Sequence, residues 1–279
     1  MTAESHLIGI FDSGVGGLSV LREIHALLPA QPVLYFADQG HVPYGSRQIE
    51  EVRAFARGIT RYLLGQGAQL IVIACNTASV AALKILREEY PQIPFVGMEP
   101  AVKPAAEQSR SGKVGVLATE ATFQTAMYAS VVDRFAHGVT LMEDPCPGLV
   151  SQIEKGNLAG QETRAILTRA LEPMINAGVD TIVMGCTHYP FVIPLIHELA
   201  GPRLRVIDPA PAVARQVRRV LEANSLLAPA AATASVRFVT SGDALQFQQA
   251  LHSLIGVQAP VEKAVWQEEE IKNTGGCAA

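Results

Sequence analysis

Residues 70–79 read LIVIACNTAS, and residues 181–190 read TIVMGCTHYP. In both stretches a short apolar run, rich in β-branched residues, ends in a small residue and a cysteine, Cys75 or Cys186, that hydrogen-bonding side chains follow. Such a run is typical of a buried parallel strand. Each stretch therefore predicts a strand that delivers a thiol at its carboxyl end. A helix-forming run follows each copy, and the free N–H groups at a helix start can bind an anion and lower the pKa of a nearby thiol.

Strands and helices alternate on both sides of the first stretch. Before it, the pattern predicts strands at 7–11 and 33–37 and helices at about 18–28 and 47–64. A further strand is expected at 93–98, and a second series begins with strands at 114–118, 139–142 and 181–185. This alternation predicts an α/β fold of mostly parallel sheets flanked by helices. Because both series contain a strand that ends in a cysteine, we expect two pseudo-symmetric domains from a diverged internal duplication.

The domain boundaries are placed at changes in this pattern. The first domain is expected to comprise residues 1–98 and 208–266 and to carry Cys75, and the second to comprise residues 99–207 and to carry Cys186. Residues 204–209 are expected to be a crossover back to the first domain. A helix at 211–223, an Ala/Pro-rich linker at 227–234, a strand at 236–239 and a helix at 243–254 are expected to complete that domain. Residues 267–279, with three consecutive glutamates and two glycines, are expected to be a poorly ordered tail.

Composition narrows the class of protein. The 279 residues carry a net charge of −4, which gives no electrostatic footprint for nucleic acid or an anionic membrane. No apolar run approaches the roughly 20 residues that span a bilayer, and the N-terminus lacks the pattern of a secretory signal. We therefore expect a cytoplasmic protein with a small-molecule ligand. The four cysteines show no paired spacing of a metal site, and we expect free thiols and no metal.

Two strand-end thiols on two similar domains suit one kind of chemistry. A molecule bound in a cleft between the domains would have one thiol on each face, so one thiolate could remove a Cα proton while the other thiol supplies a proton from the far side. Inversion of a stereocentre in this way needs no redox cofactor. Ser13, Asn76, Thr77 and Thr187 are of the right type to hold a carboxylate and an ammonium group, and Asp12 and His188 to handle the protons of the thiols.

The first strand runs into DSGVGG at residues 12–17. Its glycines let the backbone approach a ligand, but their spacing misses the dinucleotide fingerprint G-x-G-x-x-G, and the lysine of a P-loop is absent. The same residues are also consistent with a helix cap and a tight turn alone.

Several stretches in the same order resemble a known family. They are FDSGVGGL (11–18), PYG (43–45), ACNTA (74–78), LAT (117–119) and GCTHYP (185–190). Through them the chain resembles the glutamate racemases, which belong to the cofactor-independent aspartate/glutamate racemase superfamily, over almost its whole length.

This resemblance implies roles for individual residues. It implies that Cys75 is the acid/base residue for D-glutamate and Cys186 the one for L-glutamate, assisted by Asp12 and His188. It implies that the substrate is contacted by Asp12, Ser13, Tyr44, Gly45, Asn76, Thr77, Thr187 and His188, with Glu154 and Thr119 behind them. It further implies a homodimer without a cofactor that supplies D-glutamate for peptidoglycan synthesis.

Three departures bear on these expectations. Ser19 stands where threonine is usual, and residues 39–41 occupy a loop that varies in the family, so His41 is assigned no role. The short N-terminus lacks the extension of members that a cell-wall precursor activates, so no such regulation is expected here.

Other functions stay open. An aspartate racemase or a related isomerase of the superfamily would carry the same motifs. A cysteine hydrolase would need a Cys–His pair, and His188 lies only two residues from Cys186, which is too local for the usual spatially assembled base. A binding protein for amino acids is a further alternative. Cys146 and Cys277 are expected to be packing residues.

Overall fold

The computed structural model describes residues 6–99, 101–136, 138–229 and 235–277, with the side chains described as far as residue 273. Contacts divide the chain into two units. Unit 1 comprises Met1–Met98 and Ala210–Ala279, and unit 2 comprises Glu99–Pro209. The sequence predicts a first domain of 1–98 with 208–266 and a second of 99–207.

Unit 1 is built on a seven-stranded sheet in the order β11-β10-β9-β2-β1-β3-β4. Its strands are β1 (Ile8–Asp12), β2 (Val33–Ala37), β3 (Leu70–Ile73), β4 (Phe95–Gly97), β9 (Val236–Thr240), β10 (Val261–Gln267) and β11 (Glu270–Cys277). All neighbours pair in parallel except β10 and β11. Every residue of β1, β2 and β3 is buried, which agrees with their continuous apolar sequences.

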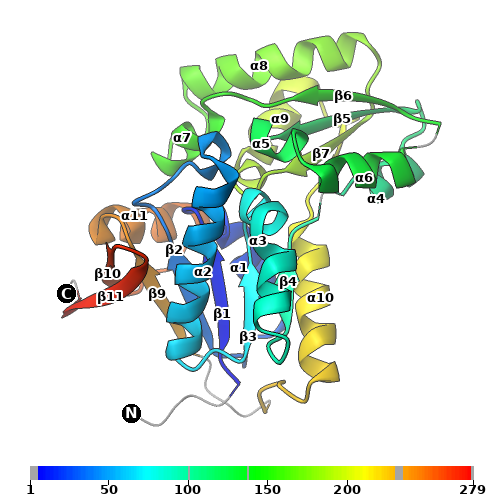
Figure 1. Ribbon diagram of the computed structural model, residues 1–279. Helices are drawn as coiled ribbons and strands as arrows, with labels where there is room; N and C mark the ends of the chain where they lie inside the picture. The colour runs from blue at the N-terminus through cyan, green and yellow to red at the C-terminus, as the bar shows by residue number, and fades with distance from the viewer. Residues whose placement is uncertain (1–5, 100, 137, 230–234, 278–279) are drawn as a thin grey trace. The chain divides into compact units, whose positions relative to one another are not determined.

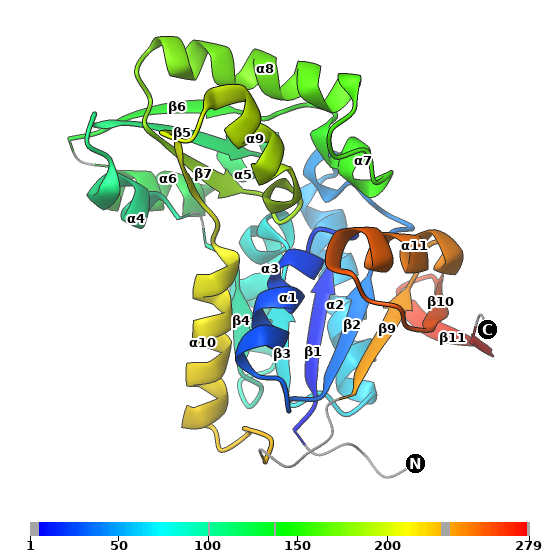
Figure 2. The same ribbon diagram turned by 180° about the vertical axis from the view of Figure 1, so that it is seen from behind.

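Helices cover both faces of this sheet. On one face lie α2 (Ile49–Gly65) and α3 (Asn76–Glu89), which Figure 1 shows in front of the strands. On the other face lie α1 (Leu18–Leu27), α10 (Ala210–Ala223) and α11 (Ala244–Ile255), which Figure 2 shows from behind. A short 3-10 helix, η1 (Tyr44–Ser46), precedes α2.

Unit 2 has a four-stranded parallel sheet in the order β6-β5-β7-β8. Its elements are β5 (Lys113–Ala118), β6 (Thr140–Asp144), β7 (Thr181–Gly185), β8 (Arg205–Ile207), α4 (Val102–Gln108), α5 (Glu120–Phe123), α6 (Ala126–Phe135), α7 (Leu149–Glu154), α8 (Gln161–Asn176), η2 (Tyr189–Val192) and α9 (Ile193–Ala200). Val114, Val116 and Val183 of the sheet pack with residues of α4 and α6 in one apolar cluster.

The two units share a strand order. In unit 1 the strands that come first, second, third and fourth along the chain stand in the order β2-β1-β3-β4, and in unit 2 the corresponding order is β6-β5-β7-β8. The cysteine follows the third strand in both. The prediction of an α/β fold with helix-flanked parallel sheets is confirmed, and the shared order agrees with the expected duplication.

The prediction of a poorly ordered tail at 267–279 is wrong for the described residues. Glu270–Cys277 form β11, which pairs antiparallel with β10. Long-range contacts hold this hairpin, since Arg61 of α2 donates to the Glu269 carbonyl (2.8 Å) and Tyr62 donates to Asn273 Oδ1 (2.6 Å). Those partners lie some 200 residues earlier in the sequence, so local composition does not reveal them.

The expected linker at 227–234 lies partly outside the described residues. Among the residues that the structure describes, no helix has the length and apolarity needed to cross a membrane.

Candidate active site

Cys75 stands where β3 gives way to α3. Its backbone is extended (φ −141°, ψ 122°), and its side chain caps the helix by accepting the Ala78 N–H at 3.4 Å. The thiol is buried, with 5% of the residue exposed. A sulfur at the start of a 14-residue helix faces the positive end of the helix dipole. The predicted strand-to-helix junction around this cysteine is therefore present.

The parallel pairing of β1 with β3 brings the end of β1 beside Cys75. Phe11 is opposite Ile73, so Asp12 and Ser13 emerge at the same edge. Cys75 Sγ lies 4.0 Å from Ser13 Oγ, and Ser13 Oγ lies 3.4 Å from Asp12 Oδ1. Asp12 is fully buried and accepts the Gly17 N–H at 2.7 Å. The three side chains form a chain of polar groups from a thiol to a carboxylate.

Gly17 is required by the close packing around Asp12. A Cβ atom at this position would lie 2.7 Å from Tyr35 Oη and 2.8 Å from Asp12 Cβ, closer than real Cβ contacts. Tyr35 also donates to the Gly14 carbonyl at 2.9 Å. The glycine-rich turn thus serves to bring backbone N–H groups against the Asp12 carboxylate.

Asn76 and Thr77 open α3 beside the thiol. Asn76 is 3% exposed, and both polar atoms of its side-chain amide are buried without a hydrogen-bond partner among the residues that the structure describes. A buried amide without partners costs folding free energy, and such groups are rare in native proteins. The side chain is suited to hydrogen bonding with a bound polar ligand. Thr77 follows on the first turn and is half-buried.

Tyr44 and Gly45 lie in η1, in the loop that follows β2. Tyr44 is buried and donates to Asp38 Oδ2 at 2.6 Å. Burial, and then the neighbouring Asp38 carboxylate, raise the pKa of Tyr44 well above its ordinary value, so the phenol stays a donor. The Asp12 and Cys75 side chains add to this effect.

Asp38 is a site residue that the sequence analysis missed. It is fully buried directly after β2 and accepts hydrogen bonds from Tyr44, Ser241 and Trp266. The sequence signal that could have identified Asp38 is its position directly after a buried strand, since Asp12 likewise stands at the end of one. His41, to which no role was assigned, has its Nδ1 2.9 Å from Asp38 Oδ2.

Cys186 follows β7 in unit 2, in the position that Cys75 has after β3. A Cβ atom on the preceding Gly185 would lie 2.6 Å from Ala118 Cβ, so this glycine permits β5 and β7 to approach. Thr119, the next residue after β5, therefore emerges beside the cysteine strand. Thr119 Oγ1 lies 3.0 Å from Thr122 Oγ1. Thr187, directly after Cys186, is buried.

His188 and Glu154 form a second chain of polar groups. Cys186 Sγ lies 3.8 Å from His188 Nδ1, and His188 Nε2 lies 2.6 Å from Glu154 Oε1. Burial disfavours the imidazolium, but the contacts with Cys186 and Glu154 outweigh it and raise the pKa of His188 well above 6.5. The chain turns into η2 after Cys186, so the His188 ring lies back against the sulfur although the two residues are only two positions apart. This contact is compatible with the expected assistance of Cys186 by His188.

The remaining cysteines differ from these two. Cys146 is 1% exposed, and burial followed by the nearby Asp144 raises the pKa of its thiol, so it stays protonated. Cys75, Cys146 and Cys186 are free thiols, and the side chain of Cys277 lies outside the described residues. The packing role expected for Cys146 agrees with its burial.

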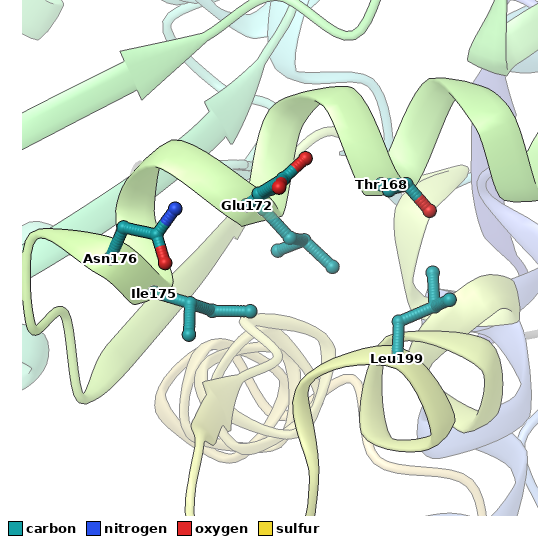
Figure 3. A pocket seen from close by; sticks show the side chains of 6 residues that line it. Thr168, Glu172, Ile175, Asn176 and Leu199 are labelled. Atoms are coloured by element: carbon teal, nitrogen blue, oxygen red, sulfur yellow. The ribbon is translucent and has the colours of Figure 1, made fainter.

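Among the described residues, no three His, Cys, Asp or Glu side chains gather as metal ligands would. A hollow between α8 and α9 is lined by Thr168, Leu171, Glu172, Ile175, Asn176 and Leu199 (Figure 3). Its lining residues all belong to these two helices, and none of them follows a strand. The hollow therefore contains no residue of the segment after β7 that carries Cys186.

Comparison with known proteins adds to this geometry. Residues 8–217 match the Asp/Glu/hydantoin racemase family. The chain belongs to this family. It is therefore a racemase, and like other family members it is built from α/β units with parallel sheets. The chain is 52% identical over 265 residues to a glutamate racemase of Pseudomonas aeruginosa, covering 95% of this chain and 100% of that one.

Two crystal structures of family members show the same architecture. Glutamate racemase isoform RacE1 of Bacillus anthracis superposes with a TM-score of 0.84 at 30% identity, over 96% of this chain and 99% of that one. The Escherichia coli glutamate racemase, in complex with L-glutamate and the activator UDP-MurNAc-Ala, superposes with a TM-score of 0.81 at 31% identity, over 93% and 98% of the chains.

The Glu154→Gln variant tests the second polar chain. Without the carboxylate, we expect the pKa of His188 to fall toward 6.5. In the parent protein the folded-state pKa is raised, so the stability that this pair contributes is present below pH 6.5 and is lost as the pH rises through the folded-state pKa. NMR titration of the His188 ring in the variant and in the parent protein measures the change. An unchanged His188 titration would contradict the assignment.

The Asn76→Leu variant tests the buried amide. Replacing polar atoms that have no partner by an apolar side chain of similar size is expected to leave the free energy of unfolding unchanged or to raise it by about 1 kcal/mol. Ligand affinity should fall by about tenfold or more, because the donor and acceptor for the ligand are gone. Denaturant unfolding and glutamate titration measure the two effects. A large loss of stability would show that the amide serves the fold instead.

Proposed function

We propose that the protein interconverts L-glutamate and D-glutamate with two cysteines, one of which removes the proton at Cα while the other delivers a proton to the opposite face. The observation that carries the proposal is that in each unit a buried thiol follows the third strand, and a chain of polar groups leads from that thiol to a carboxylate. In unit 1 the chain is Cys75–Ser13–Asp12, and in unit 2 it is Cys186–His188–Glu154. Two thiols with separate proton relays are what a two-base racemisation needs.

In the direction from L- to D-glutamate, the Cys186 thiolate removes the Cα proton. The Cα–H bond breaks, an S–H bond forms, and the Cys75 thiol transfers its own proton to the opposite face of Cα. Cys75 is left as a thiolate, and the reverse reaction exchanges the roles. This requires the two sulfurs to face opposite sides of one substrate.

The environment of each thiol supports a different way of handling protons. A protonated His188 can donate to the Cys186 sulfur, and Glu154 stabilises the imidazolium. In unit 1 the Cys75 S–H can donate to Ser13 Oγ, whose own O–H donates to Asp12 Oδ1. Both routes end in a buried or nearly buried carboxylate, which favours the positive or polarised partner before it.

Substrate binding would use the groups around Cys75 and the loop after β2. The unpartnered Asn76 amide and Thr77, at the N-terminus of α3, suit an α-carboxylate, since an anion is favoured there by the helix dipole. Ser13, Tyr44 and Gly45 lie at the same edge of the unit 1 sheet, and Thr187 and His188 are the corresponding groups of unit 2.

The relatives support glutamate over aspartate. The Pseudomonas aeruginosa protein, 52% identical, is named glutamate racemase, and the Escherichia coli structure holds L-glutamate. We propose that D-glutamate made by this chain enters cytoplasmic peptidoglycan precursors. We also propose that the protein forms a homodimer. Sedimentation velocity tests this, and a monomer at every protein concentration would contradict it.

A cysteine hydrolase is the second candidate, because the order Cys186–His188–Glu154 resembles a nucleophile, a base and an orienting carboxylate. It leaves the Cys75 chain without a purpose, whereas racemisation uses both. Membership of a racemase family also favours the first candidate.

Incubation of the purified protein with L-glutamate in D2O tests the reaction. We expect D-glutamate that carries deuterium at Cα, without any added cofactor, because the proton delivered to the second face comes from a thiol that has exchanged with solvent. Chiral chromatography and mass spectrometry measure both. The absence of D-glutamate and of exchange, with the same reaction observed on L-aspartate, would move the assignment to aspartate racemase.

Substitution of single cysteines tests the two-base mechanism. Cys75→Ala and Cys186→Ala should each lower kcat by on the order of 10³-fold or more, since each removes one acid/base group. Cys146→Ala is the matched control, as a buried thiol outside both polar chains, and should retain kcat. With a β-chloro substrate, Cys75→Ser should lose HCl elimination from the D-enantiomer and Cys186→Ser from the L-enantiomer. If each variant eliminated HCl from both enantiomers to the same extent, this would contradict the placement of the two cysteines on opposite faces of the substrate.

A further inference from the structure

Asp38 joins three segments of unit 1 that are far apart in the sequence: its own loop after β2, the segment after β9 and the strand β10. Its Oδ1 accepts from Ser241 Oγ at 2.6 Å and from Trp266 Nε1 at 2.8 Å, and its Oδ2 accepts from Tyr44 Oη at 2.6 Å. His41 Nδ1 lies 2.9 Å from Oδ2. A fully buried carboxylate needs such donors, because an unpaired charge in the interior is costly. The loop after β2 and the strand β10 therefore share one acceptor.

The Trp266 ring is held in a fixed orientation. A Cβ atom on Gly58 of α2 would lie 2.5 Å from ring atom Cζ3 and 2.6 Å from Cη2, so the missing side chain leaves the room that the indole fills. The ring also packs against Phe55 (centroids 5.7 Å apart) and His41 (5.3 Å). With the ring held between α2 and the His41 ring, the indole N–H donates to Asp38 at 2.8 Å.

The hairpin of β10 and β11 is itself fastened to α2. Trp266 stands opposite Ile271 in the pair, and both pack against the unit 1 core. The Arg61 and Tyr62 side chains of α2 reach Glu269 and Asn273 of the hairpin. Figure 1 shows β10 and β11 beside α2. The hairpin is thus a rigid support and not a loose end of the chain.

We propose that Trp266 is a positioning residue for substrate binding. Through Asp38 it fixes Tyr44, and with Tyr44 the backbone of the turn that contains Gly45. The inference rests on the proposed function in one respect, that this turn contacts the substrate. Trp266 touches no reacting atom, so its loss should weaken binding of both enantiomers equally and leave the chemical step unchanged.

The Trp266→Phe variant tests this proposal. Phenylalanine keeps an aromatic ring at this position of β10 and removes the N–H donor. We expect KM for L- and D-glutamate to rise about fivefold each, as for the loss of one hydrogen bond, with kcat within about twofold of the parent. Hydrogen exchange of residues 38–46 should be faster in the variant. Unchanged KM together with unchanged exchange in this segment would overturn the proposal.

Tyr62→Phe is the matched control. It removes a hydrogen bond between α2 and the hairpin, to Asn273, and leaves every donor to Asp38 in place. We expect its KM and the exchange of residues 38–46 to equal those of the parent. The same rise in KM in Tyr62→Phe would show that the hairpin acts by general stability and would overturn the role of the Trp266 N–H.

A double-mutant cycle with Tyr44→Phe measures the link itself. If Trp266 acts through Asp38 on Tyr44, the double variant should have about the KM of the weaker-binding single variant, and additive effects would overturn the link.

Trp266 is the sole tryptophan of the sequence, so its fluorescence emission in Tyr44→Phe reports on the same cluster even if Trp266→Phe does not fold. A shift is expected, and unchanged emission counts against the link. An inactive parent protein would defeat the proposed function, whereas the exchange and emission measurements would still judge the Trp266–Asp38–Tyr44 link.

Discussion

Parallel pairing of β1 with β3, and of β5 with β7, is the constraint on which the surroundings of the cysteine in each unit depend. It requires neighbouring strands to end at one edge, which in unit 1 brings Cys75 to the polar turn after β1 and in unit 2 places Cys186 at the same edge as the residues that follow β5. Buried strands supply rigid backbones there. Gly185 shows how closely the geometry is set, because even a methyl group at that position would collide with Ala118.

Within this shared arrangement the two thiols have different partners. Cys75 caps an α-helix and reaches a carboxylate through a hydroxyl, whereas Cys186 precedes a 3-10 turn and reaches one through an imidazole. The repeat therefore preserves the position of the sulfur and not the chemistry around it. Under the proposed two-base mechanism, this difference allows each thiol to be tuned for its own enantiomer without disturbing the other.

Buried carboxylates organise the polar edges of unit 1. Asp12 gathers the N–H of the glycine-rich turn, and Asp38 gathers donors from the loop, β10 and the segment after β9. Each carboxylate is an acceptor that must be filled on burial, so each fixes the segments that supply its donors. Loop residues expected to bind substrate thereby gain the rigidity of the sheet, although they lie outside regular strands.

The sequence by itself determined the alternation of strands and helices, the two cysteine-bearing strand ends and the position of Asp12, because buried strands and glycine-rich turns leave local patterns. It also pointed to Asn76 and His188, which directly follow the cysteine strands. Only the tertiary structure decided that the glutamate-rich end of the chain forms β11, that Asp38 is a shared acceptor and that Trp266 reaches it. Those features depend on α2 and β2 meeting residues some 200 positions away, and contacts of that range leave no periodic signal in the chain. The lack of a hydrogen-bond partner for the Asn76 amide among the described residues likewise depends on the tertiary structure, because it follows from which side chains surround the amide.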